Sequence, residues 1–339
     1  MNKILDLFDE EKVKVLFKEK ILPFYPNFCD IKKIDIKAYK KQIWETTYHV
    51  VLEFNTSFKT KKGKIKKMPI VCSAHSNEPR ENFYIALSYL WEHNFSGPFF
   101  SVPHPLFYSD YYRGVFYRGV AGNTLYHHIK KNNRSEIEAI IPLTAKWFAK
   151  LHNLSVNGTP NFNLENSRIE TALPGIKQIL ARVQVVYPEY YDIYHKIYKK
   201  LDENEKKFFA STKKKWLVHG DAHPENIISM SKRKIAAIDF ADLCLSDYAR
   251  DIGSFTQQLD YMCGRKIGDS DFTKKIKELF LKIYFENFKN GQQAGIDDRI
   301  KNYYNWTAMR TATYFLTRYN PDPSRAEPLI EAVAHDLRF

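Results

Sequence analysis

Residues 217–251 read LVHGDAHPENIISMSKRKIAAIDFADLCLSDYARD, and this stretch carries the strongest chemical signal in the chain. An apolar strand leads into a His-Gly-Asp tripeptide that ends at Asp221, and Asn226 follows five residues later. A hairpin then returns a second apolar strand that ends at Asp239. The hairpin geometry can bring Asp221, Asn226 and Asp239 to the same end of a sheet.

The side chains of these three residues suit phosphate chemistry that depends on a metal. Mg²⁺ prefers oxygen ligands and is usually held by one or two carboxylates together with phosphates. A carboxylate beside that metal can accept a proton from a hydroxyl nucleophile. The spacing fits phosphoryl transfer, in which an Asp acts as the base, an Asn five residues later binds one metal, and an Asp on a following strand binds the other. Considered singly, Asp221 and Asp239 would be turn residues, and His219 and His223 would be alternative metal ligands.

The segment also resembles a known family. HGDAHPEN followed by IDF resembles the HGDxHxxN and IDF or IDW signatures of the aminoglycoside phosphotransferase and choline kinase superfamily, whose members are small-molecule kinases with a protein-kinase-like fold. Three further segments are similar to the family's LxxLHxL helix, its GDPxxDLA segment and its hinge: AKLHNL (149–154), DYARDIGSF (247–255) and FYRGVAGNTL (116–125). The resemblance covers the C-terminal two-thirds well and the first lobe loosely.

The resemblance implies a fold of class α+β, the two-lobed protein-kinase-like fold. A small β-rich N-terminal lobe with a leading helix, residues 1–120, would bind the nucleotide. A larger helical C-terminal lobe, residues 121–339, would carry the catalytic loop and the acceptor site. Hydrophobic periodicity by itself predicts the elements of the first lobe, with strands at 31–38, 47–54 and 68–75 and helices at 3–20 and 80–93.

The resemblance also implies a role for each matching residue. Asp221 would be the catalytic base, or the residue that orients the acceptor hydroxyl, and Asn226 and Asp239 would bind Mg²⁺. The backbones of Arg118 and Val120, in the hinge, would meet the adenine, because backbone N–H and C=O groups can read it. The cofactors implied are ATP or GTP and Mg²⁺, and the substrate is a small-molecule hydroxyl compound.

One family feature is missing from the expected third strand. Kinases of this shape usually carry a lysine there that grips the α- and β-phosphates, but residues 68–75 read MPIVCSAH. His75 or Arg80 could substitute as a phosphate ligand, with Glu81 as the partner of that cation, or the strand could lie in another register. The missing lysine leaves open a second interpretation, a pseudokinase or metabolite-binding module without turnover.

Composition and charge limit the other classes of function. The 339 residues suggest about two domains, and a hydrophobic content of 44% is enough for a sizeable core. Four scattered cysteines fit a reducing compartment. No apolar run approaches ~18 residues, and the N-terminus carries acidic residues where a signal peptide would be apolar. We therefore expect a cytoplasmic protein with no membrane partner.

The positive charge does not by itself predict binding to nucleic acid. The formal net charge is +13, and six lysines fall in residues 59–67, KTKKGKIKK, between two expected strands. A solvated hairpin tip explains this run, and the remaining charge is spread over both halves of the chain. We expect no nucleic-acid partner, and the oligomeric state stays open.

The acceptor is less well specified than the donor. The family implies aminoglycosides, choline or ethanolamine, homoserine, methylthioribose, sugars or nucleosides, and the net charge argues against polycationic acceptors. Tyr303, Tyr304 and Trp306 could form a cage for a quaternary ammonium group or could pack in the core. Arg310 and Arg318 could suit an acidic or phosphorylated acceptor.

Overall fold

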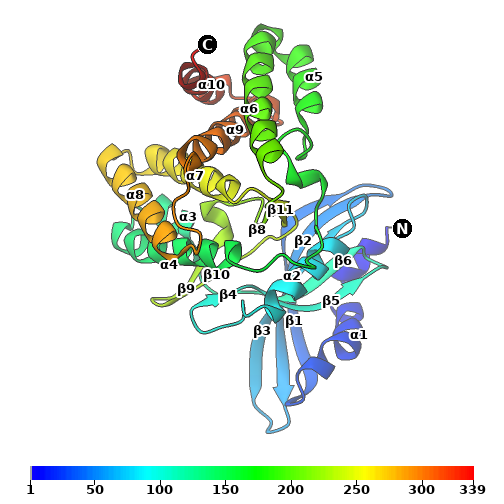
Figure 1. Ribbon diagram of the computed structural model, residues 1–339. Helices are drawn as coiled ribbons and strands as arrows, with labels where there is room; N and C mark the ends of the chain where they lie inside the picture. Colours follow the sequence, from blue (N-terminus) through cyan, green and yellow to red (C-terminus); the bar gives the residue numbers. More distant parts are fainter. Residues whose placement is uncertain (1) are drawn as a thin grey trace. The chain divides into compact units, whose positions relative to one another are not determined.

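The structure is a computed structural model that describes residues 2–339 (Figure 1). Backbone contacts divide the chain into two compact units. The first comprises Met1–Gly122 and Arg233–Ala241, and the second comprises Asn123–Lys232 and Asp242–Phe339. Strands dominate the N-terminal part and helices the C-terminal part, which confirms the predicted α+β class.

A five-stranded antiparallel sheet forms the body of the first unit, in the order β1-β2-β3-β6-β5. Its strands are β1 (Phe28–Ile43), β2 (Tyr48–Thr60), β3 (Ile65–His75), β5 (His104–Ser109) and β6 (Gly114–Arg118). The three expected strands are present but extend further than predicted. Lysine and threonine side chains weaken the apolar pattern at the strand ends, although pairing with the neighbouring strand continues there.

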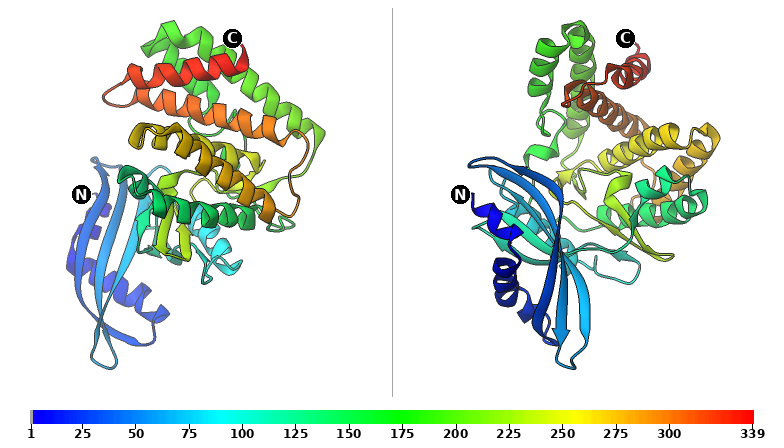
Figure 2. Two further views of the ribbon diagram at one scale, coloured as in Figure 1. Left: turned by 90° about the vertical axis from the view of Figure 1, so that its left-hand side faces the viewer. Right: turned by 180° about the vertical axis from the view of Figure 1, so that it is seen from behind.

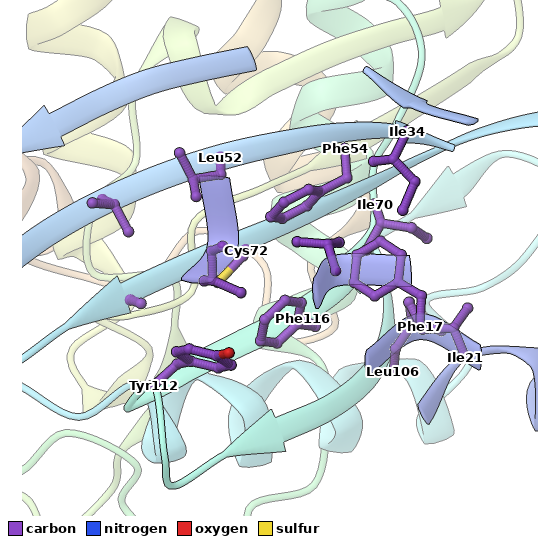
Figure 3. Close-up of a cluster of buried hydrophobic side chains, with 14 of the residues drawn as sticks. Phe17, Ile21, Ile34, Leu52, Phe54, Ile70, Cys72, Leu106, Tyr112 and Phe116 are labelled. Carbon is purple, nitrogen blue, oxygen red and sulfur yellow. The ribbon is translucent and has the colours of Figure 1, made fainter. Parts of the chain in front are cut away.

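The core of the first unit lies between this sheet and α1 (Glu10–Lys20), which Figure 2 shows along one face of the strands. Phe17 of α1 packs edge-on against Phe54 of β2 and Phe116 of β6, at ring-centroid distances of 5.2 and 6.2 Å. Figure 3 shows these rings together with Ile70 and Cys72 of β3. Alternate residues of β2 and β3 therefore face α1, and the intervening residues face the other way.

The remaining elements of the first unit are short, apart from one helix. The predicted helix at 3–20 is divided at Asp9, whose carboxylate accepts from the backbone N–H groups of Glu11 and Lys12 and so begins α1. The other elements are the 3₁₀ helices η1 (Lys3–Phe8) and η2 (Leu22–Phe24), the helix α2 (Glu81–Glu92), and the parallel pair β4 (Phe100–Ser101) and β10 (Lys234–Ala237).

The second unit is mainly helical, and α7, α9 and α10 pack side by side in it (Figure 2). Its helices are α3 (Leu125–Lys130), α4 (Arg134–His152), α5 (Ile176–Val186), α6 (Tyr191–Ser211), α7 (Ala249–Lys266), α8 (Ser270–Asn287), α9 (Ile296–Thr317) and α10 (Pro323–Leu337), with the 3₁₀ helices η3 (Glu165–Ser167), η4 (Pro188–Tyr190) and η5 (Pro224–Asn226). Among residues 2–339, no helix is long and apolar enough to cross a membrane.

Two short antiparallel strand pairs complete the second unit. β7 (Asn123–Thr124) pairs with β9 (Ile227–Ser231), and β8 (Trp216–Val218) pairs with β11 (Cys244–Ser246). Residues of β8 and β11 are largely buried. The second pair thus fixes the two ends of the segment that the sequence identified as most informative.

Candidate active site

The loop that follows β8 is held by one buried carboxylate, Asp251 of α7. The backbone N–H groups of His219 and Gly220 donate to the two oxygens of Asp251, at 2.7 and 3.0 Å. His152, at the end of α4, bonds to the same carboxylate at 3.0 Å through Nε2. Burial opposes ionisation, but these bonds hold the pKa of Asp251 below its usual value. The loop is therefore anchored by an ionised group within the protein.

Gly220 is the residue that allows this loop its path. Its φ of +82° lies in the left-handed region, which side chains disfavour. A Cβ atom there would also collide with the carbonyl group of Asp242 and would lie 2.6 Å from Nδ2 of Asn166. The glycine of the His-Gly-Asp tripeptide is required for both reasons.

The catalytic residue predicted by the sequence, Asp221, lies directly after this glycine and contacts two neighbours. Nδ2 of Asn226 donates to the carbonyl oxygen of Asp221 at 2.9 Å and to its carboxylate at 3.2 Å. Nε2 of His223 lies 3.3 Å from the same carboxylate. Nδ1 of His223 accepts from the backbone N–H of Glu225, so the imidazole proton belongs on Nε2 and points to Asp221. His223 is therefore placed to donate to the carboxylate of Asp221.

The surroundings of Asp221 keep it ionised. Loss of solvent opposes ionisation, but His223, His219 and Arg310 hold the pKa of this carboxyl well below its usual range. Nearly half of the side chain remains exposed, at 46%. An exposed, ionised carboxylate on an anchored loop is suited to bind and orient a hydroxyl group.

The predicted metal ligands offer oxygen atoms of the kind that Mg²⁺ prefers. Because both bonds of Asn226 to Asp221 use its nitrogen, Oδ1 of Asn226 is the atom that can bind a cation. Asp239 belongs to the first unit, is exposed, and has a φ of +65°. A left-handed conformation is uncommon for residues other than glycine, although Asp tolerates it better than most. An amide oxygen and a carboxylate fit a hard cation.

The predicted nucleotide-binding residues lie at the end of β6 and the end of β3. Arg118 closes β6, and Val120 follows in the segment without regular structure that leads out of the first unit. The amide of Gly119 between them donates to the carbonyl of Pro69 on β3, at 2.9 Å. His75 ends β3, and its Nδ1 accepts from the backbone N–H groups of Asn77 and Glu78. Only Nε2 of His75 is therefore left to meet a phosphate.

The strand register shows where the lysines of the first three strands lie relative to the middle of β3. Lys66 and Lys67 lie on β3 at its lysine-rich end, paired with β2 at Phe58 and Ser57. Ser73, which faces away from the α1 core, pairs with Val51 of β2, and Val51 pairs with Lys40 of β1. Cross-strand partners lie on the same face of a sheet.

Lys40 therefore shares a row with Ser73, and several charged groups of the first unit surround it. Partial burial lowers the pKa of Lys40, and Arg80 lowers it further, whereas Asp239 and Glu78 act in the opposite direction. Arg80 itself contacts Nε2 of His49 at 3.4 Å and Glu78 at 3.6 Å. The carboxylate that pairs with Arg80 is thus Glu78 and not the expected Glu81.

A cavity of about 580 Å³ adjoins the Asp221 loop, and all of its lining residues belong to the second unit. Trp306, Arg310 and Arg318, which the sequence proposed for the acceptor, line it together with Arg325 of α10. Tyr303, in contrast, is buried and donates its hydroxyl to Glu205 at 2.8 Å.

Tyr304 also stays away from this cavity, because its hydroxyl donates to Asp260 at 2.6 Å. The ammonium cage considered from the sequence therefore does not form from Tyr303, Tyr304 and Trp306. Sequence analysis did not single out Arg325. The only local feature of the sequence near Arg325 was the pair of prolines, Pro321 and Pro323, where a helix begins.

An anchored His-Gly-Asp loop beside a cavity, together with a five-stranded β-rich unit, agrees with the small-molecule phosphotransferases of protein-kinase-like fold that the sequence resembles. The protein-family model described as "Phosphotransferase enzyme family" matches residues 69–284. The chain belongs to this family, which confirms the predicted family and the predicted class of enzyme. No curated protein matches the chain significantly.

Solved structures share the fold at low identity. One is a Ralstonia eutropha JMP134 protein provisionally described as an aminoglycoside phosphotransferase, with a TM-score of 0.62 and 13% identity, covering 97% of this chain and 98% of that one. The streptomycin–ATP complex of APH(2'')-IIa gives 0.55 and 17%, covering 96% of each chain. The Plasmodium vivax ethanolamine kinase gives 0.55 and 14%, covering 89% of this chain and 81% of that one.

Proposed function

We propose that this protein is a Mg²⁺-dependent kinase that transfers the γ-phosphate of ATP or GTP to a hydroxyl group of a small molecule. The observation that carries the proposal is the ionised Asp221, fixed by Asn226, His223 and the Asp251 anchor beside a cavity of about 580 Å³. Solved structures of similar fold contain ATP, ADP or GDP, which supports a nucleoside triphosphate as the donor.

In the proposed reaction, Asp221 accepts a hydrogen bond from the acceptor hydroxyl. The hydroxyl oxygen forms a bond to the γ-phosphorus, and the bond from that phosphorus to the bridging oxygen breaks. The nucleoside diphosphate leaves with the electrons of the broken bond, and the hydroxyl proton passes to Asp221. Because the pKa of Asp221 is low, it acts first by orienting the hydroxyl and takes the proton late.

Asn226 and Asp239 are the proposed Mg²⁺ ligands, through an amide oxygen and a carboxylate. An ion held by these two residues would neutralise charge on the phosphate oxygens. Arg118 and Val120 remain the proposed contacts to the adenine through their backbones. His75 remains a proposed phosphate contact through Nε2, the ring nitrogen that its loop does not use.

Lys40 is the proposed replacement for the third-strand lysine. It supplies the only cationic side chain in the row of Ser73, Val51 and Val115 across the described strands. Its position near Asp239 and Arg80 places positive charge beside a proposed metal ligand, where phosphates would bind.

The test is a nucleotide-consumption screen of the wild-type protein with Mg²⁺ and ATP or GTP against a metabolite library. We expect acceptor-dependent release of the nucleoside diphosphate, and a loss of at least a hundredfold in kcat for Asp221→Asn. Asp271→Asn, at an exposed site on α8, is the matched control and should behave as wild type.

Two outcomes would contradict the proposal. If Asp221→Asn kept its turnover, Asp221 would have no catalytic role. Nucleotide binding without turnover of any acceptor would favour the pseudokinase or binding module, which the absence of a lysine from the middle of β3 first suggested. The cytoplasmic location and the absence of a nucleic-acid partner stay predictions from the sequence.

A further inference from the structure

The cavity beside Asp221 is lined by an unusual set of charges for a site that would accept an amine. Four of its lining residues are arginines: Arg250, Arg310, Arg318 and Arg325. Its carboxylates are Asp221 itself, Glu225, which is exposed, and Asp242. Once Asp221 is assigned to the hydroxyl group, the remaining lining holds four arginines and two carboxylates.

Two of these arginines are already engaged within the protein. Arg250 is buried, with 2% of its surface exposed, and donates to the side-chain oxygen of Asn166 at 2.7 Å and to the carbonyl of Gly220 at 3.2 Å. Arg318 pairs with Asp322 at 3.2 Å. Both guanidinium groups therefore have partners within the protein, and we assign neither of them to ligand binding.

Arg310 and Arg325 are less buried than Arg250. Unlike Arg318, neither has a carboxylate within 4.0 Å of its guanidinium group among residues 2–339. Arg310 donates to the carbonyl of Leu173 at 2.7 Å and lies over the Trp306 ring at 5.0 Å. Arg325 donates to the Tyr261 hydroxyl at 2.8 Å. Neutral partners orient both groups. Asp221 and Asp242 act on Arg310 electrostatically, but neither carboxylate pairs with it directly.

Aromatic rings hold these two guanidinium groups at the cavity wall. The Arg325 guanidinium lies 3.8 Å from the centre of the Phe315 ring, and Phe315 and Trp306 both belong to α9. Guanidinium groups stacked on aromatic faces lose little further freedom on binding, and their planar forks match carboxylates and phosphates. Burial lowers the pKa of Arg310, although Asp221 and Asp242 act in the opposite direction.

We propose that the acceptor carries, in addition to its hydroxyl group, a carboxylate or phosphate group that binds Arg310 and Arg325. This inference rests on the proposed kinase function and names the chemical class of its substrate. An anionic group would pair directly with these two guanidinium groups, whereas the amines of an aminoglycoside or of ethanolamine would meet two cations that no carboxylate contacts directly. The hydroxyl of the same molecule reaches Asp221.

The experiment compares four hexose probes of similar size that differ in charge: glucose, glucosamine, glucuronate and glucose 6-phosphate. Thermal unfolding of the full-length protein is followed with each probe, in the presence of saturating Mg²⁺ and a non-hydrolysable ATP analogue. We expect glucuronate or glucose 6-phosphate to raise the melting temperature more than glucose does, and glucosamine to give no increase. The two acids distinguish a carboxylate from a phosphate ligand.

Substitutions of single arginines then test which side chains cause the preference for an acidic probe. Arg325→Gln removes the two side-chain bonds to Tyr261 and the stacking on Phe315. It should weaken binding of the favoured acid at least tenfold and binding of glucose much less. Arg310→Lys, which keeps the charge, should retain the preference in part. Arg265→Gln, an exposed arginine of α7 outside the cavity lining, is the matched control and should bind as wild type.

Two results would overturn the inference: no preference of the wild-type protein for either acid over glucose, or an equal preference in Arg325→Gln. Failure of the kinase proposal would look different. In that case the ATP analogue alone would not raise the melting temperature, or no probe or library acceptor would be phosphorylated. Binding of the four probes would still show whether the protein prefers an acid.

Discussion

At the scale of single residues, the roles of the acidic side chains follow from what surrounds each of them. Asp221 is partly exposed and faces His223, whereas Asp251 is fully buried and receives bonds from His152 and from the loop. The first is available to a substrate. The second cannot touch one, so its effect on the reaction is to position Asp221.

A third carboxylate, Asp247, gives a prediction that depends on pH. Its side chain is 1% exposed and lies 3.2 Å from Nε of Arg299. Burial raises the pKa of Asp247 to about 6, although Arg299 opposes this. Because the folded-state pKa lies above the unfolded value of about 4, the protonated form contributes stability at low pH, and this contribution is lost as the pH rises through 6.

We therefore expect the free energy of unfolding of the wild type, relative to Asp247→Asn, to fall between pH 4 and pH 7 by on the order of 1–3 kcal/mol. Urea unfolding of both proteins at several pH values measures the difference. Comparison with the variant removes the contribution of carboxylates whose pKa is lowered, such as Asp251, which act in the opposite direction. A difference that is constant or rises with pH would refute the expectation.

At the scale of elements, the register of β1, β2 and β3 decides which side chain can replace the missing lysine. A register shift between Ala38 and Lys40 puts Lys40 opposite Val51, and hence in the row of Ser73. Without that shift, Lys40 would not pair with Val51. The sequence shows the lysine but not the bulge, because the bulge depends on how two strands pair.

Lys40→Met tests this placement. We expect the KM for the nucleotide to rise at least tenfold, because a cation that contacts phosphates is lost while the apolar stem is kept. Lys37→Met is the matched control, since Lys37 lies on the same strand, is exposed, and pairs with Glu53 in the register. Equal KM values for Lys40→Met and the wild type would show that another group, such as His75 or Arg80, meets the phosphates.

At the scale of the whole molecule, the two units are not two consecutive pieces of the chain. Residues 233–241, which include Asp239, belong to the first unit although they lie in the C-terminal half of the sequence. The proposed donor-side residues Lys40, His75, Arg118, Val120 and Asp239 therefore belong to the first unit, whereas Asp221 and Asn226 belong to the second.

A ligand that binds only the folded protein should accordingly stabilise it. We expect Mg²⁺ with ATP or GTP to raise the melting temperature, by an amount that corresponds to ~2.7 kcal/mol at a ligand concentration of 100 Kd. The shift should shrink in Lys40→Met and in Asp239→Asn and should stay unchanged in Lys37→Met. Differential scanning fluorimetry measures it, and the absence of any shift at millimolar nucleotide would contradict the kinase proposal.

The catalytic loop could be predicted from the sequence because its chemistry is local. Asp221 and Asn226 are five residues apart, and the glycine between β8 and Asp221 sets the backbone path by itself. The pairing of Asn226 with Asp221 then follows from a single turn of chain. A segment of this kind specifies its own geometry, so its motif identifies the family without knowledge of tertiary contacts.

Other parts of the site depended on contacts between residues far apart in the chain. Arg325 reaches the cavity because α10 places it beside Tyr261 of α7, 64 residues earlier in the chain. Arg310 lies over Trp306 and donates to the carbonyl of Leu173, 137 residues away. The sequence analysis names Arg310 as a candidate contact of an acidic acceptor, but no local pattern distinguishes Arg325 from the exposed arginines.

The amino-acid sequence thus determined the fold class, the family and the identity of the Asp221 loop, because periodicity, turn residues and short motifs act over a few neighbouring residues. Only the tertiary structure decided which lysine stands in the row of Ser73, which carboxylate anchors the loop, and which charges line the cavity. Those depend on strand register and helix packing, which bring together side chains separated by tens to more than a hundred residues.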